Sequence, residues 1–208
     1  MEVAELDYWR NCRRGIGVCK ERTGFESGSL PIRLTARIIH LDHPTRLAHG
    51  SHTMEPPIKQ IPAIPVISRT DRLTIPQIPA HSGPAVQSLI ESLKQLGIPP
   101  IAGDMIYVYH GCNGDPTQEF DLEICLPVPS GLNLRLERPI ELKTTTPFRC
   151  VSVDYVGPMS GFGAAWMNLV RWVSAAGHKP TGQSREIYKK WVSFNAPDNV
   201  TELQQGIE

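Results

Sequence analysis

Apolar residues recur at helical spacing in two stretches of the chain. The first stripe consists of Val86, Leu89, Ile90, Leu93 and Leu96. We expect Ser82 to cap this helix, Pro84 to lie in its first turn and Gly97 to end it. The second stripe consists of Phe162, Ala165, Trp166, Leu169 and Val173. It predicts a helix over residues 160–176, about a turn and a half longer than the first, with Gly177 at its end.

Stretches rich in β-branched and aromatic residues flank both predicted helices. They predict strands over residues 63–73, 105–110, 120–128, 148–156, 184–191 and 200–207. Prolines recur between Pro56 and Pro79, and proline has no amide hydrogen to donate to a neighbouring strand. We therefore expect the first of these strands to lie at a sheet edge.

The two halves of the chain can be aligned on each other. The Gly-Pro pair at residues 83–84 is matched with the Gly-Pro pair at residues 157–158. The same fourteen-residue step joins a tyrosine to a glutamate in each half, from Tyr109 to Glu123 and from Tyr188 to Glu202. Such shared spacing over several elements is typical of an internal repeat.

These matches predict an α+β fold, a tandem duplication of a strand–helix–strand–strand unit with antiparallel sheets and a central ligand groove. The first copy is expected over about residues 58–128 and the second over about residues 147–207. Residues 1–55 have no sustained helical or alternating pattern. We expect them to form a poorly structured or accessory extension to one domain of residues 56–208.

Alternation along the strands predicts which side chains line the groove. Because successive side chains of a strand point to opposite faces, the helices are expected to cover the most apolar faces. The opposite faces of the two halves would then meet at Tyr107, Tyr109, Glu123, Glu186, Tyr188 and Glu202. Trp166 and Trp191 are added as further aromatic residues that can reach a ligand there.

Glu186 is the residue of this set with the clearest chemical consequence. A carboxylate buried against aromatic rings either takes up a proton or binds a cation, and the rings add cation–π attraction. The alternative is an ion pair of Glu186 with Lys190 or Lys143. Glu123 and Glu202 are equally open to a structural role and to contact with a ligand.

Composition excludes several classes of protein. The chain has 208 residues with 21 basic and 21 acidic side chains, so it lacks the surplus positive charge that nucleic-acid binding needs. No window is apolar enough to span a membrane, and the first ten residues do not form a secretory signal. Five irregularly spaced cysteines indicate reduced thiols, so we expect a cytoplasmic protein.

No motif indicates a cofactor or a metal. The sequence contains no nucleophile-elbow, zinc-protease, phosphate-loop or dinucleotide-binding signature. Four histidines between His40 and His52 have a spacing open to metal binding, although a surface arm with histidines by chance explains them as well. We expect no cofactor, haem included, and no metal.

Four segments resemble the GyrI-like domain, a fold that binds small-molecule effectors. They are residues 103–128, 148–177, 182–191 and 199–208, and the likeness is strongest at the Gly-Pro before the second helix, at REIY (185–188) and at TEL (201–203). The resemblance covers about residues 58–207 and implies a groove for hydrophobic, often cationic, compounds. An acidic residue is the family's usual cation contact, which the REIY match assigns to Glu186, with Tyr188 beside it.

The resemblance leaves three functions open. The first is a stand-alone binding protein that holds hydrophobic, cationic or aromatic compounds. The second is a hydrolase of cyclopropane-bearing natural products, as in some stand-alone members, with Glu186 and Tyr188 as its catalytic groups. The third is a protein-interaction role such as topoisomerase inhibition, with a partner protein on the exterior. Other members carry DNA-binding domains, but residues 1–53 show no helix-turn-helix pattern, so no direct nucleic-acid contact is expected.

Overall fold

The computed structural model describes residues 55–98 and 104–208 of the chain. The N-terminal extension and its histidines therefore lie outside the described residues. Eight strands are formed: β1 (Ile58–Ile61), β2 (Pro65–Leu73), β3 (Met105–His110), β4 (Phe120–Pro127), β5 (Ile140–Thr144), β6 (Phe148–Val156), β7 (Pro180–Lys190) and β8 (Val200–Ile207). Two helices, α2 (Ile78–Gln95) and α3 (Phe162–Ala175), follow the short 3₁₀ turns η1 (Ile75–Gln77) and η2 (Met159–Gly161). The predicted α+β class is confirmed.

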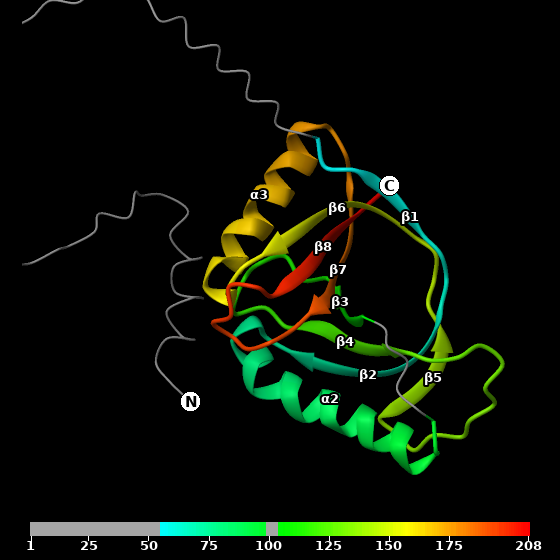
Figure 1. Cartoon of the computed structure of the whole chain (residues 1–208). Coiled ribbons are helices and arrows are strands. Elements are labelled where there is room, and N and C mark those ends of the chain that lie inside the picture. The colour runs from blue at the N-terminus through cyan, green and yellow to red at the C-terminus, as the bar shows by residue number, and fades with distance from the viewer. Residues whose placement is uncertain (1–54, 99–103) are drawn as a thin grey trace, which may run out of the picture. The chain divides into compact units, whose positions relative to one another are not determined.

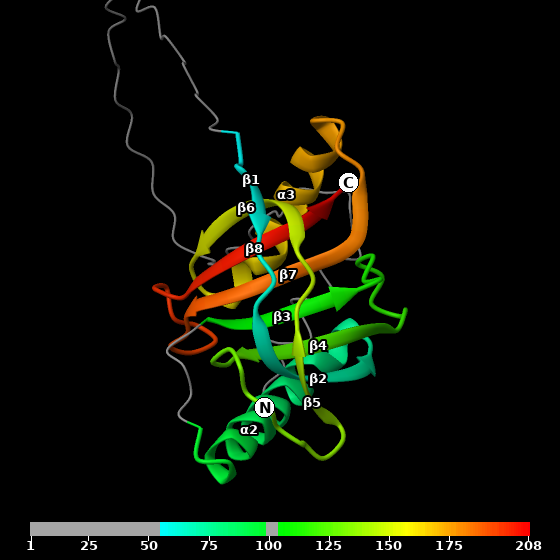
Figure 2. The ribbon, with the colours of Figure 1, turned by 90° about the vertical axis from the view of Figure 1, so that its right-hand side faces the viewer.

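The eight strands form one antiparallel sheet in the order β1-β6-β8-β7-β3-β4-β2-β5. This order has twofold character, since β1, β6, β8 and β7 mirror β5, β2, β4 and β3 (Figure 1). Each edge strand pairs with a strand from the other half, β1 with β6 and β5 with β2. Figure 2 shows the connections β1–β2 and β5–β6 running together across the other strands, where the amide of Thr145 donates to the carbonyl of Ile64.

The strand register is also the same in both halves. In the first half, the paired residues run Ser68–Cys125–Ile106 across β2, β4 and β3. In the second half, the corresponding run is Ser152–Gln204–Arg185 across β6, β8 and β7. A tandem duplication would produce such matching registers, although the duplication itself stays a prediction.

The start of α2 differs from the sequence-based expectation. The helix begins at Ile78 with Pro79 in its first turn, so Ser82 and Pro84 lie inside it, and the Ser82 hydroxyl donates to the Ile78 carbonyl at 2.7 Å. Residues 83–84 therefore do not correspond to residues 157–158, which precede α3. The expected lengths are reversed as well, because α2 has 18 residues and α3 has 14.

Both predicted helix ends are confirmed. Gly97 and Gly177 have φ angles of 67° and 75°, the left-handed conformation that favours glycine. The amides of the next residues, Ile98 and His178, donate back to carbonyls of the last helical turn.

The expectation that the first predicted strand lies at an edge is wrong. β2 lies between β4 and β5, and Val66 and Ile67 on its two faces are both fully buried. Pro65 is tolerated because it is the first residue of the strand. The true edge strands, β1 and β5, were not predicted.

The helices cover one face of the sheet. Leu89 and Leu93 of α2 pack in one core cluster with residues of β2, β3, β4 and β5, and Leu169 and Val173 of α3 pack in another with residues of β6 and β8. Full burial of such side chains contributes about 1.5–3 kcal/mol each. A smaller apolar cluster, which includes Val108, lies on the opposite face. The sheet is thus buried on both faces near its centre.

Candidate functional site

The centre of the sheet brings together four of the predicted site residues. Tyr107 of β3 lies directly opposite Glu186 of β7, and Tyr109 and Tyr188 point to the same face as this pair. Tyr107 also lies opposite Ile124, which packs in the cluster of α2. The four residues therefore lie on the face that carries the helices.

Glu123 and Glu202 lie on the opposite face of the sheet. Glu123 is paired with Val108 and Glu202 with Ile187, the neighbours of Tyr107 and Glu186 along their strands. The expectation that all six residues share one face is wrong. β3 is buried on both faces, so its hydrophobic pattern does not indicate which side the helices cover.

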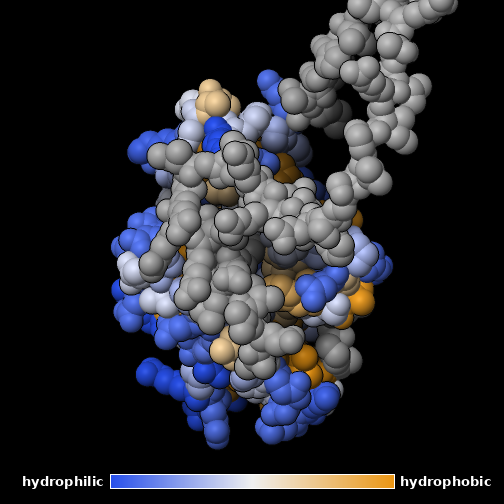
Figure 3. Space-filling model, turned by 90° about the vertical axis from the view of Figure 1, so that its left-hand side faces the viewer, coloured by the Kyte–Doolittle hydropathy of each residue, from blue (hydrophilic) through white to orange (hydrophobic). Residues whose placement is uncertain are grey.

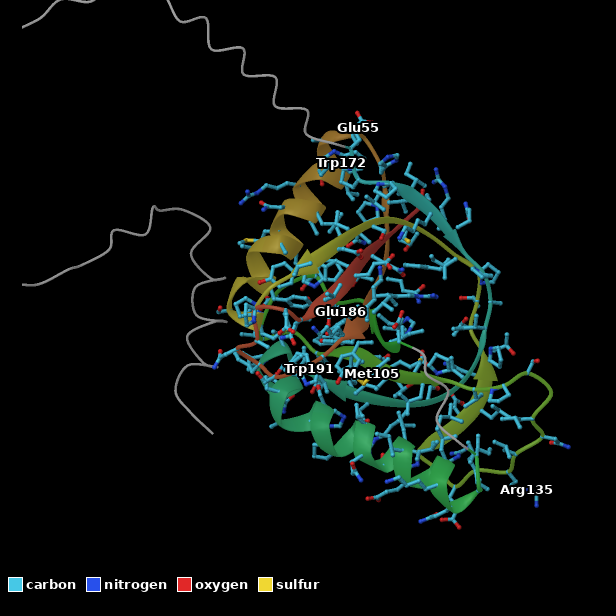
Figure 4. The ribbon with its side chains drawn as sticks, in the orientation of Figure 1. Glu55, Met105, Arg135, Trp172, Glu186 and Trp191 are labelled. Atoms are coloured by element: carbon cyan, nitrogen blue, oxygen red, sulfur yellow. The ribbon has the colours of Figure 1, made fainter. Side chains whose placement is uncertain are left out.

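Three aromatic side chains donate hydrogen bonds to Glu186. The hydroxyls of Tyr109 and Tyr188 donate to Oε2 at 2.7 and 2.8 Å, and Nε1 of Trp166 donates to Oε1 at 3.0 Å. The residue is only 5% exposed. Figure 4 places Glu186 at the middle of the sheet, with Trp191 and Met105 nearer to α2. Residues from β3, β7 and α3 thus converge on one buried carboxylate.

No cation pairs with Glu186 among the described residues. Lys190 binds Asp198, and Lys143 binds Glu123, so neither of the two alternative ion pairs is formed. Burial raises the pKa of Glu186 above its usual value, and the hydrogen bonds from Tyr109, Tyr188 and Trp166 oppose that rise only in part.

Tyr107 and Tyr109, beside Glu186, stay protonated at neutral pH. Burial raises the pKa of Tyr107 to about 12, although a hydrogen bond with Ser82 opposes the shift. Burial and the nearby Glu186 carboxylate raise the pKa of Tyr109 well above its usual value. Ser82 is a neighbour of the site that the sequence did not indicate, because it was expected to cap α2.

A row of aromatic rings leads from this cluster to the surface. The rings of Tyr107 and Tyr188 are 4.9 Å apart, and those of Tyr188 and Trp191 are 5.8 Å apart. Trp191 is 48% exposed. The buried Asn199 fixes the following loop, since its side chain accepts from the amide of Val192 and donates to the carbonyl of Ser193.

Exposed hydrophobic surface is limited in the described part of the chain. On the side that Figure 3 shows, hydrophobic areas, in orange, are separated by hydrophilic side chains. Apart from Trp191, the large hydrophobic residues with high exposure are Ile58, Leu96, Val156, Met167, Val170 and Val192. Trp191 is the residue of this set whose ring continues the aromatic row from Glu186.

Glu202 is held by a network on the opposite face. Lys59 of β1 and Lys189 of β7 each lie 2.8 Å from its carboxylate, and Ser152 and Gln204 donate hydrogen bonds to it. These partners outweigh the effect of burial and lower its pKa to about 2. This number of partners favours a structural role for Glu202.

Glu123 occupies the corresponding position in the other half. Lys143 of β5 lies 2.5 Å from its carboxylate and His110 lies 3.4 Å away, and the pKa of Glu123 is again lowered to about 2. In each half, a lysine from the edge strand thus reaches a buried glutamate of a strand further inside the sheet. These contacts favour the structural interpretation of both glutamates.

Arg185 is a buried charge that the sequence did not single out. It is 3% exposed, its guanidinium lies 4.0 Å from the centre of the Phe148 ring, and it donates to the Thr146 carbonyl at 3.4 Å. Burial lowers its pKa. The alternation along β7 places Arg185 and Glu186 on opposite faces of the sheet, so they do not neutralise each other.

Neither a metal cluster nor a membrane span is found within residues 55–98 and 104–208. No group of three or more histidine, cysteine, aspartate or glutamate side chains in these ranges is placed to hold a metal ion. No helix in the same ranges is long and apolar enough to cross a membrane.

Solved structures share this fold at low sequence identity. The EcmrR–DNA complex matches with a TM-score of 0.61 and 19% identity over 73% of this chain, which spans 56% of the length of that EcmrR chain. SAV2435 bound to tetraphenylphosphonium matches with a TM-score of 0.52 and 11% identity, over 74% of this chain and 94% of that one. A hydrolase encoded by lin2189 from Listeria innocua matches with a TM-score of 0.54 and 14% identity, over 74% and 92%.

At these identities the likeness to solved structures concerns the fold alone. A search of curated proteins finds no significant match. A family model, however, matches residues 54–202, which include both helices, Glu186 and the aromatic row. The chain therefore belongs to the family of GyrI-like small molecule binding domains.

Proposed function

We propose that this domain binds lipophilic organic cations on the helix-bearing face of the sheet, with Glu186 as the counter-charge. The observation that carries the proposal is a buried carboxylate with no cationic partner among the described residues. A buried charge is costly unless it is paired, and a cationic ligand supplies the missing charge. Membership of a small-molecule-binding family supports the same conclusion.

The aromatic residues around Glu186 suit a ligand that is both apolar and positively charged. A cation over the face of a tyrosine or tryptophan gains about 0.5–2 kcal/mol per ring. Tyr107, Tyr188 and Trp191 form a continuous row of such rings, which ends at the surface. Tetraphenylphosphonium, the ligand of the structurally similar SAV2435, combines a buried charge with four phenyl rings and is a suitable probe.

Calorimetric titration of the full chain tests the proposal. Triphenylphosphine oxide, a neutral compound with the same kind of aromatic body, serves as the matched control ligand. We expect tetraphenylphosphonium to bind at least tenfold more tightly, because only the cation gains from the carboxylate. Mass spectrometry after the titration should find both compounds unchanged. Equal affinity for the two compounds would contradict a role for charge in this site.

Hydrolysis is the second candidate, and one observation favours it. Glu186 has a raised pKa and shares a hydrogen bond with the partly exposed Tyr188, an arrangement suited to general acid–base catalysis. In this scheme, Glu186 activates a water molecule and a tyrosine protonates the leaving group. A cyclopropane-bearing electrophile that gains the mass of one water with wild type, but not with Glu186→Gln, would support hydrolysis over binding alone.

A further inference from the structure

We infer that the site selects cations without N–H groups, such as quaternary ammonium and phosphonium ions, over protonated amines with the same body. The reason is that side chains of the protein already occupy most acceptor positions of the Glu186 carboxylate. This inference rests on the proposed binding of cations at Glu186 and specifies their chemical class.

The hydrogen bonds to Glu186 leave little room for a further donor. An ionised carboxylate offers about four lone-pair positions, two on each oxygen. Tyr109 and Tyr188 both donate to Oε2, at 2.7 and 2.8 Å, and Trp166 donates to Oε1 at 3.0 Å. One position on Oε1 is left for a ligand.

A protonated primary amine needs stronger acceptors than the side chains around Glu186 provide. It carries three N–H groups, each of which is hydrogen-bonded in water and must find a new partner when the ion is buried. The indole of Trp166 is a donor only, and the hydroxyls of Tyr109 and Tyr188, whose hydrogens are directed at Glu186, offer only phenol oxygens, which are weaker acceptors than water or a carboxylate. An ammonium ion at Glu186 would therefore exchange strong hydrogen bonds to water for weaker ones.

A quaternary cation does not have this disadvantage. It has no N–H group to satisfy, and its attraction to the carboxylate and to the ring faces requires no directed hydrogen bond. The rings of Tyr107 and Tyr188, whose centres are 4.9 Å apart and whose planes are tilted by 57°, offer such faces beside Glu186. Tyr109, Tyr188 and Trp166 thus act as specificity-determining residues, because their hydrogen bonds favour the charged form of the carboxylate and occupy its acceptor positions.

A pair of ligands that differ only at nitrogen tests this inference. The full chain is titrated at neutral pH with (4-phenylbenzyl)trimethylammonium and with (4-phenylbenzyl)ammonium, both of which are cations under these conditions. We expect the trimethylammonium compound to bind at least tenfold more tightly. Equal affinity, or a preference for the amine, would overturn the inference but leave cation binding at Glu186 intact. If neither this compound nor tetraphenylphosphonium binds, the proposed function itself fails, and the inference with it.

Variants separate hydrogen bonding from the added apolar area of the methyl groups. Tyr109→Phe and Trp166→Phe each free one acceptor position on Glu186 and should lower the affinity ratio of the two ligands at least threefold. Tyr155→Phe is the matched control, because the Tyr155 hydroxyl donates to the Pro158 carbonyl and not to Glu186. It should leave the ratio unchanged. A ratio that stays at the wild-type value in both Tyr109→Phe and Trp166→Phe would overturn the inference.

Discussion

Glu186→Gln is expected to weaken tetraphenylphosphonium binding at least tenfold, a change of about 1.4 kcal/mol. Glutamine has nearly the same shape, and its amide oxygen can still accept from Tyr109 and Tyr188, so the substitution removes the charge and, of the three hydrogen bonds, only the one from Trp166. The affinity for the neutral triphenylphosphine oxide should not change. Titration calorimetry on wild type and variant in one buffer measures both effects, and far-ultraviolet circular dichroism verifies that the variant is folded.

Glu123→Gln is the matched control for this experiment. Glu123 is also 5% exposed, but it lies on the opposite face of the sheet and is paired with Lys143. The substitution should therefore leave cation affinity unchanged. If both variants lost affinity to the same degree, the effect would reflect general charge or stability, and Glu186 would not be the counter-charge.

The raised pKa of Glu186 adds a second check on the same prediction. Because burial favours the neutral form, lowering the pH through this pKa protonates Glu186 and removes the counter-charge. Cation affinity of the wild type should therefore fall as the pH is lowered and approach that of Glu186→Gln. The variant should lack this pH dependence, and an identical pH profile for both proteins would contradict the assignment.

Local sequence predicted the elements whose stability depends on their own apolar pattern. α3, β3, β4, β6 and β8 were found close to their expected positions. β1 and β5 were missed because each is short and pairs with a strand of the other half of the chain. The start of α2 was misplaced because three prolines, at positions 76, 79 and 84, each allow a helix start, and the pattern does not choose among them.

Only part of the candidate site could be predicted from the sequence, and the reason is again physical. The cluster of Glu186 with Tyr107, Tyr109 and Tyr188 follows from alternation along β3 and β7, together with their pairing. The face on which the cluster lies does not follow, because Ile106, Tyr107, Val108 and Tyr109 are all buried. A strand with both faces buried carries no alternating polarity, so only the packing of α2 reveals the helix-bearing face.

The stability of the domain is expected to fall in acid, mainly through Glu123 and Glu202. The pKa of each is about 2 in the folded protein, against an ordinary value of 4.5. A lowered pKa contributes stability that is fully present above about pH 4.5 and is lost as the pH falls toward 2. Each group should contribute on the order of 2–3 kcal/mol. Urea unfolding between pH 2 and 7 measures this loss, and Glu202→Gln should make it smaller.

Glu202 and Glu123 have different numbers of close cationic partners. This difference can test whether the ion pairs are the source of the stability. In Lys59→Met, Glu202 keeps Lys189 at 2.8 Å as an ion-pair partner. In Lys143→Met, the one possible ion-pair partner left to Glu123 among the described residues is His110, at 3.4 Å. Loss of the last close partner of a buried charge is the more costly change. At neutral pH, we therefore expect Lys143→Met to lower the free energy of unfolding more than Lys59→Met. The difference should disappear near pH 2, where both carboxylates begin to be protonated, and a difference that persisted there would point to lost packing of the lysine side chains.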